Sequence, residues 1–91
     1  MQNHVLIFSA SWCSPCRQMK HFVWSNSDVQ DALEKFDSVQ TIDIDQNKQM
    51  AMAYRVDSVP RVYIVDEEGK PTKMSGFMGI EDTVEFLNEQ K

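Results

Sequence analysis

The sequence predicts an α/β domain in which a four-stranded mixed sheet is flanked by helices. Short apolar runs rich in β-branched residues alternate with amphipathic segments along the chain. The first two predicted strands are separated by helical segments, which favours a parallel pair joined by a right-handed crossover. The last two are separated only by a short polar turn, which favours an antiparallel hairpin. The length of 91 residues fits a single domain spanning 1–91.

The first half of the chain predicts one strand followed by two helices. Residues 4–9 form the strand, and a helix begins within 13–15, because Pro15 is well tolerated in a first helical turn. Ser27 is expected to be the N-cap of the second helix, with Gln30 completing a capping box. The apolar positions of this helix follow a helical period at Val29, Ala32, Leu33 and Phe36.

The second half predicts three strands and two helices. These elements are a strand at 39–44, a helix at 47–55, a strand at 62–65, a short edge strand at 72–75 and a helix at 80–90. The strand at 62–65 is continuously apolar, which is typical of a central strand. The polar turn between the last two strands contains Gly69, which can adopt a positive φ angle.

Composition and charge exclude several classes of function. Apolar residues make up 42% of the chain, which indicates an ordered core, and the net charge is −5. Nucleic acids and anionic membranes attract basic proteins, so neither is an expected partner. No apolar stretch approaches the ~20 residues that span a bilayer. No Lys or Arg precedes residue 17, so no signal peptide is expected, and we expect a cytoplasmic monomer.

The only two cysteines lie in the segment Trp12-Cys13-Ser14-Pro15-Cys16, at the junction of a predicted strand and a predicted helix. A helix N-terminus stabilises a thiolate, which is the attacking species in thiol–disulfide exchange. We therefore expect Cys13 to be the nucleophile. Cys16, one helical turn later and more enclosed, would be the resolving thiol. Pro15 stiffens the turn, and Trp12 offers an apolar surface beside the nucleophile.

Two other roles for the cysteines are less consistent with the sequence. A structural disulfide is unusual in a chain without an export signal. A structural zinc site needs about four ligands, and only His4 and His21 could join the two sulfurs. His4 precedes Cys13 by nine residues along a strand, and His21 lies off the helical face of Cys16. We therefore expect neither a metal nor an organic cofactor, only a redox-active pair formed by Cys13 and Cys16.

Several segments resemble the thioredoxin family. Phe8–Cys16 is similar to the family's strand and active-site loop, and Val59-Pro60 is similar to its cis-proline loop. Gly76-Phe77 matches its third substrate loop, and Ile44–Asn47 resembles the end of a central family strand. The resemblance implies that Pro60 is cis and that the backbone of Val59 pairs with an extended substrate. The substrate surface it implies comprises Trp12, Ser14, Pro15, Val59, Pro60, Gly76 and Phe77.

The chain also departs from the family pattern. The chain starts at the strand that carries the motif, so the N-terminal strand and helix of full-length thioredoxins are expected to be missing. The family's buried acid would fall at Ile7 and its lysine partner at Thr41. Arg17 and Arg61 follow Cys16 and Pro60, where each could favour thiolates or simply face water.

The resemblance implies a protein-disulfide reductase. Its expected partners are disulfide-containing protein substrates and an electron donor, either a thioredoxin-reductase-type enzyme or another dithiol. Residues 22–33 and 75–78 are also similar to the C-terminal thioredoxin domain of membrane-bound thiol:disulfide interchange reductases. The alternative is a thioredoxin-fold binding module or accessory subunit, whose interface would be an exposed patch formed by Trp12, Phe77 and Met78.

Overall fold

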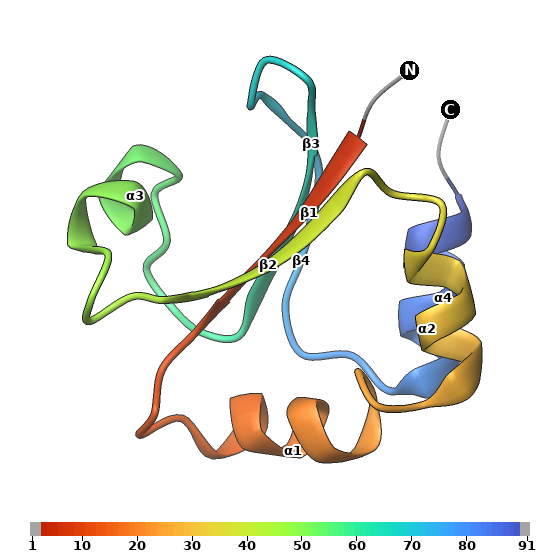
Figure 1. Ribbon diagram of the computed structural model, residues 1–91. Coiled ribbons are helices and arrows are strands. Elements are labelled where there is room, and N and C mark those ends of the chain that lie inside the picture. Colours follow the sequence, from red (N-terminus) through yellow and green to blue (C-terminus); the bar gives the residue numbers. More distant parts are fainter. Residues whose placement is uncertain (1–2, 90–91) are drawn as a thin grey trace.

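The computed structural model describes residues 3–89 and confirms a four-stranded mixed sheet flanked by helices (Figure 1). The strands are β1 (Asn3–Ser9), β2 (Ser38–Asp43), β3 (Arg61–Asp66) and β4 (Pro71–Ser75). The helices are α1 (Ser14–Phe22), α2 (Ser27–Leu33), α3 (Lys48–Ala53) and α4 (Ile80–Asn88). The expected helix end at residue 90 lies outside the described residues.

The sheet has the strand order β2-β1-β3-β4. As the sequence predicts, β1 and β2 are parallel, whereas β3 runs antiparallel to both β1 and β4. The apolar strand β3 is central, also as expected. β2 pairs only with β1 in the described part of the chain and forms an edge. In this chain Ile44–Asn47 therefore follow an edge strand.

Two apolar clusters cover the two faces of the sheet, and Figure 1 shows α1, α2 and α4 on one face with α3 on the other. Alternation along β1 divides its side chains between the faces. Val5 and Ile7 join the cluster beneath α1, α2 and α4, while Leu6 and Phe8 join the cluster beneath α3. Because α1 begins where β1 leads out of the core, its first turn is fixed at one end of the sheet.

The capping box predicted at Ser27 is wrong. Asn26 is the N-cap of α2, and its Oδ1 accepts hydrogen bonds from the backbone N–H groups of Asp28 and Val29. The Gln30 side chain donates to the carbonyl of Trp24 rather than closing the box. Both Asn and Ser are good caps, so the choice depends on which residue has extended backbone, and this is Asn26.

Helix α2 is also shorter than its apolar pattern predicts. The helix ends at Leu33, and Phe36 lies beyond it in a turn where its N–H donates to the carbonyl of Leu33. Phe36 is nevertheless buried in the same cluster as Leu33. The periodic pattern thus identified the buried side chains correctly but overestimated the length of the helix.

Candidate active site

Cys13 and Cys16 form a disulfide at the N-terminus of α1. Cys13 is the N-cap residue and has extended backbone, which brings its sulfur to the unpaired N–H groups of the first turn. The N–H of Cys16 donates to the Sγ of Cys13 at 3.2 Å. Pro15 occupies the first turn, as predicted. The hydrogen bond and the helix dipole both favour negative charge on Cys13 when the disulfide is reduced.

The expectation that Cys16 is the more enclosed of the two cysteines is wrong. Cys13 is 4% exposed and Cys16 is 6% exposed. Both pack with Ala10, and the side chains of Ile44 and Val59 cover this cluster. Burial is similar because the disulfide draws both sulfurs into the same apolar site. The division between nucleophile and resolving thiol therefore depends on the N-cap position of Cys13.

The peptide bond between Val59 and Pro60 is cis, as the resemblance implies. Beside it lies a groove of about 500 Å³, which contains five of the predicted substrate residues. The groove is lined by Pro15, Gln18, Ser58, Val59, Pro60, Arg61, Gly76 and Phe77. A Cβ atom added to Gly76 would lie 3.6 Å from the carbonyl oxygen of Pro60. The proline loop and the loop after β4 therefore form one continuous surface.

Sequence reasoning missed Gln18 and Ser58 as groove residues. Gln18 follows Pro15 by three positions, so helical spacing already placed the two on one face of α1. No sequence pattern identifies Ser58, because the path of the loop before the cis-proline brings it to the groove.

Two predicted substrate residues, Trp12 and Ser14, do not line this groove. The indole of Trp12 is 64% exposed, and its Nε1 donates to Asp45 Oδ2 at 2.9 Å. This bond holds the ring toward the turn after β2. Ser14 is the exposed first residue of α1. Both are next to Cys13 in the chain, and their contact with a substrate stays a prediction.

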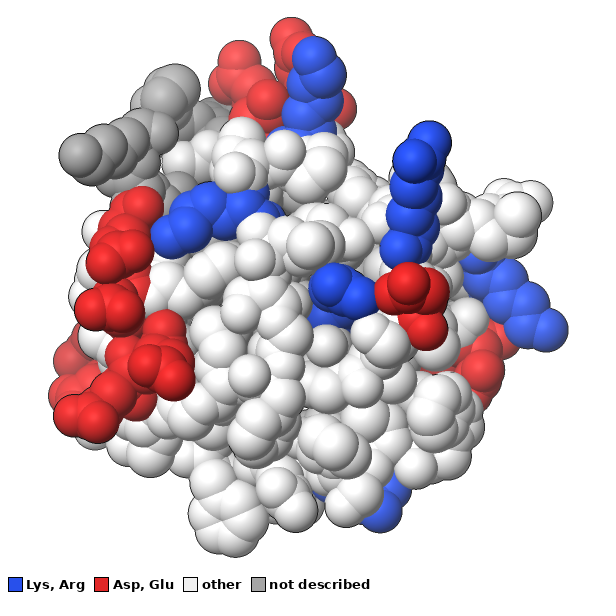
Figure 2. Space-filling model, turned by 180° about the vertical axis from the view of Figure 1, so that it is seen from behind, with Lys and Arg blue, Asp and Glu red and all other residues white. Residues whose placement is uncertain are grey.

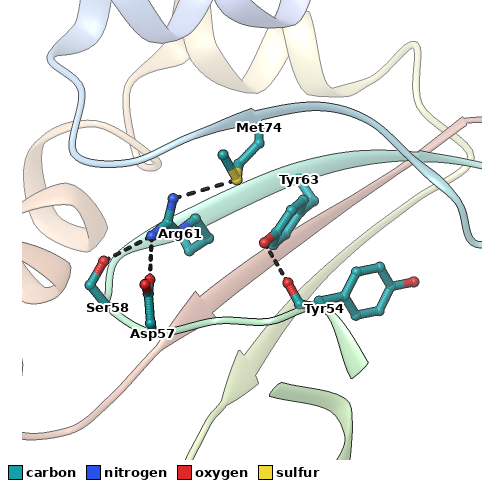
Figure 3. A network of polar contacts seen from close by, with 6 residues as sticks. All are labelled: Tyr54, Asp57, Ser58, Arg61, Tyr63 and Met74. Carbon is teal, nitrogen blue, oxygen red and sulfur yellow. Dashed lines mark hydrogen bonds and ion pairs between the residues drawn. The ribbon is translucent and has the colours of Figure 1, made fainter. Parts of the chain in front are cut away.

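Arg61 is fixed against the loop that precedes the cis-proline (Figure 3). Its Nη2 donates to Asp57 Oδ1 at 2.8 Å and to Ser58 Oγ at 2.9 Å, and its side chain is 19% exposed. Its Nη1 donates to the sulfur of Met74 on β4. The guanidinium thus joins the proline loop to the hairpin rather than facing water.

Arg17 differs from Arg61 because it is exposed and bonds within the active-site loop. Its Nη1 donates to the backbone carbonyl of Ser11 at 2.7 Å. Together with the bond between Trp12 and Asp45, this contact fixes the turn that leads from β1 to the disulfide.

The groove is lined by one charged side chain, Arg61, which forms an ion pair with Asp57. Figure 2 shows that, on the face seen from behind, Lys, Arg, Asp and Glu lie mainly toward the margins. The lower part of this face, toward the end of the molecule that carries α1, is mostly white, with some Lys or Arg surface at its lower edge. Phe77, which lines the groove, is 56% exposed. Met78, expected beside it in an exposed patch, is 7% exposed and belongs to the core, so that part of the expectation is wrong.

The strand register brings Ile7 and Thr41 together, at the two positions where the family pattern has an acid and a lysine. Ile7 is 6% exposed and packs in the core, and Thr41 is exposed on the edge strand. Neither side chain can accept a proton at neutral pH or carry a charge.

Within residues 3–89, no group of three or more His, Cys, Asp or Glu side chains could hold a metal ion. In the same part of the chain, no helix has both the length and the apolar character needed to cross a membrane.

Comparison with known proteins gives a consistent result. The family model described as a thioredoxin-like domain matches residues 2–91. A thioredoxin of Staphylococcus aureus is 30% identical over 83 residues, which cover 90% of this chain and 76% of the relative. A thioredoxin of Mycoplasma genitalium is 24% identical over 89 residues, covering 96% and 81% of the two chains.

Solved structures share the fold. The reduced C-terminal domain of DsbD from Neisseria meningitidis superposes with a TM-score of 0.81 at 21% identity, covering 99% of this chain and 82% of that domain. A thioredoxin from Thermus thermophilus gives a TM-score of 0.83 at 23% identity, covering 97% and 72%. The disulfide at a helix N-terminus, the facing cis-proline and these matches are consistent with thiol–disulfide exchange. The chain belongs to the thioredoxin-like domain family.

Proposed function

We propose that this protein reduces disulfide bonds in protein substrates through Cys13 and Cys16. The observation that carries the proposal is the position of Cys13 at the N-cap of α1, where the N–H of Cys16 donates to its sulfur. This arrangement stabilises a thiolate at Cys13, and a thiolate is the species that attacks a disulfide. The adjacent groove supplies a surface on which a substrate chain can lie.

The exchange has two steps. The thiolate of Cys13 attacks one sulfur of the substrate disulfide, forms a mixed disulfide and releases the other substrate sulfur as a thiolate. Cys16 then attacks Cys13, which re-forms the bond between the two cysteines and releases the second substrate sulfur. The substrate gains two electrons and the protein loses two, so a reductase or another dithiol must return them. A reducing compartment such as the cytoplasm would maintain this supply.

The groove supports binding of an extended substrate segment. Val59 and Pro60 line it together with Gly76 and Phe77. Gly76 has no side chain, so a peptide can approach the backbone closely at this point. Seven of the groove's eight lining residues are uncharged, which favours contact with apolar parts of a protein substrate.

Insulin reduction, followed by turbidity with dithiothreitol as electron donor, tests the proposal. The Cys13→Ser variant should lose the activity, while Ser14→Ala, which changes an exposed neighbour, should retain it. The Cys16→Ser variant should accumulate covalent adducts with substrate proteins, visible by non-reducing electrophoresis. Full reductase activity in Cys13→Ser would reject the assignment of the nucleophile.

A second candidate function is a binding module, because the large apolar side chains of Trp12 and Phe77 are 64% and 56% exposed. Under this alternative, Cys13→Ser would leave partner binding unchanged, whereas Trp12→Ala and Phe77→Ala would weaken it. Measuring both properties on the same variants separates the two functions.

A further inference from the structure

A second cleft lies on the Cys16 side of the disulfide, between α1 and the β2 edge of the sheet. Its volume is about 660 Å³, and Cys16, Ile7 and Thr41 are among its lining residues. One water molecule occupies about 30 Å³ of liquid, so the cleft has room for several. The resolving thiol therefore borders a space that water can fill, at the place where the acid and lysine of the family pattern are missing.

Asp43 contributes a carboxylate to this cleft. It follows Thr41 by two positions on β2, so both side chains project from the same face of the strand. Asp43 Oδ1 accepts a hydrogen bond from the backbone N–H of Asp45 at 2.8 Å. Its Oδ2 has no hydrogen-bond partner among the described residues. One carboxylate oxygen is thus anchored, and the other remains available to water.

Lys20 contributes a cation to the same cleft. It follows Cys16 by four positions on α1, and residues at this spacing are neighbours on a helix surface. The only ion pair among residues 3–89 joins Arg61 to Asp57, so the charges of Lys20 and Asp43 are not neutralised by a direct partner.

The other groups around Cys16 carry no competing proton acceptor. Arg17 also lines the cleft, but its guanidinium donates to the carbonyl of Ser11 and cannot accept a proton. The strand β1 contributes Ile7 and Ser9, and the loop before β3 contributes Pro60. Asp43 is the one carboxylate among the lining residues of this cleft.

We propose that Asp43 accepts the proton of Cys16 through water in the cleft and that Lys20 stabilises the resulting thiolate. In the resolving step the S–H bond of Cys16 breaks, and its proton passes to Asp43. The thiolate of Cys16 attacks the sulfur of Cys13, a bond forms between these two sulfurs, and the bond from Cys13 to the substrate sulfur breaks. The substrate sulfur leaves as a thiolate and takes up a proton from Asp43 or from water.

This inference rests on the proposed reductase function, and it moves the proton acceptor to a different strand. The family pattern has a buried acid on the strand that carries the motif, whereas here that position is Ile7. Asp43 lies on the neighbouring strand, at the register position opposite Ser9. A carboxylate that borders a cleft with room for water can accept a proton through that water.

The alkylation rate of Cys16 tests whether the charges of Lys20 and Asp43 act on its thiolate. In a Cys13→Ser background, Cys16 is the only thiol, and its rate of reaction with iodoacetamide as a function of pH reports its titration. Lys20→Gln should raise the midpoint by about half a pH unit, as expected for a charge roughly 7 Å away in watery surroundings. Asp43→Asn should lower it by a similar amount. Asp31→Asn, an equal change of charge on α2, should have no effect.

Single-turnover kinetics test the proton transfer. Reduced protein with both cysteines is mixed with a fluorescent disulfide peptide, and release of the second peptide thiol follows the resolving step. Asp43→Asn should slow this release about tenfold at pH 6 to 7, less than for a directly placed general base because water relays the proton. The effect should disappear at pH 9, where hydroxide removes the proton. The asparagine retains an oxygen that can accept the N–H of Asp45, so the turn after β2 should persist.

The direction of the rate change separates the two roles of Asp43. If this carboxylate acted only through its charge, Asp43→Asn would increase the thiolate fraction of Cys16 and speed resolution. If Asp43→Asn slows the resolving step while lowering the titration midpoint of Cys16, the result supports proton transfer from Cys16 to Asp43. An unchanged or faster resolving step rejects this transfer. The first step is measured as adduct formation by the Cys16→Ser protein. Adding Asp43→Asn to that protein should leave the rate of adduct formation unchanged. Failure of that step in the otherwise unmodified Cys16→Ser protein would instead reject the proposed reductase function.

Discussion

Replacing Ile7 by aspartate would place a carboxyl group at the position of the family's buried acid, within the core of this chain. Ile7 is 6% exposed and packs in the cluster beneath α1, α2 and α4. Losing the buried isoleucine side chain costs about 1.5–3 kcal/mol. Burial raises the pKa of the introduced carboxyl above its usual value of about 3.9, and a shift of about two units adds roughly 2.7 kcal/mol at pH 7. Ile7→Asp should therefore destabilise the fold by about 4–6 kcal/mol.

This loss is comparable to the whole stability of a small domain, about 5–14 kcal/mol for a chain of this length. Its pH dependence follows from the raised pKa of the introduced carboxyl. The folded state holds the proton more tightly than the unfolded state, so stability is highest at low pH and falls as the pH rises from about 3.9 toward the folded pKa. The Ile7→Asp variant should consequently be more stable at pH 4.5 than at pH 7.5, relative to the unmodified protein.

Thr41→Lys offers a matched second change, because the strand register places Thr41 directly beside Ile7. Thr41 is exposed, so Thr41→Lys alone should alter stability by less than about 0.5 kcal/mol. The double variant should recover about 1–2 kcal/mol of the loss, since a nearby cation stabilises the carboxylate. Urea denaturation of all four proteins at both pH values measures this coupling. A cost below about 1 kcal/mol, or no pH dependence, would refute the reasoning by showing that cleft water solvates this position.

Two further predictions concern local structure and can be measured by thermal denaturation. Asn26→Ala should cost about 1 kcal/mol because it removes the N-cap of α2, whereas Ser27→Ala should change stability by only a few tenths of a kcal/mol. A larger loss of stability in Ser27→Ala than in Asn26→Ala would instead identify Ser27 as the N-cap. Gly69→Ala should cost about 1–2 kcal/mol because Gly69 has a φ angle of 85°, whereas Gly76→Ala should stay within about 0.5 kcal/mol because its added Cβ would make an ordinary contact. Equal effects at the two glycines would contradict this assignment.

Much of the active site could be predicted because its determinants are local. Pro15 marks the first turn of α1, and the preceding apolar strand fixes where that turn begins, so the position of Cys13 at a helix N-terminus follows from the sequence. Gly69 similarly marks the turn between the last two strands. The cis bond before Pro60 was predicted only through the family resemblance, since a proline by itself is more often trans.

Other features depended on contacts that the sequence does not display. Met78 is apolar and lies next to the exposed Phe77, yet it is buried because the chain turns inward there before α4. The orientation of the exposed Trp12 indole is likewise set by its bond to Asp45, which lies 33 residues away. No local pattern distinguishes these outcomes, because each is set by a partner distant in the sequence.

The sequence by itself determined the order of strands and helices, the single cysteine pair and the absence of a charged partner for Cys16 at Ile7 and Thr41. The first two follow from residue type and spacing, which act over a few positions, and the third follows from the family resemblance. Only the tertiary structure decided that both cysteines are equally buried, that five predicted residues share one groove, and that Cys16 borders a cleft with Lys20 and Asp43. The physical reason is that strand pairing and helix packing bring together residues from α1, β2 and the proline loop, and their relative placement is a property of the packed core.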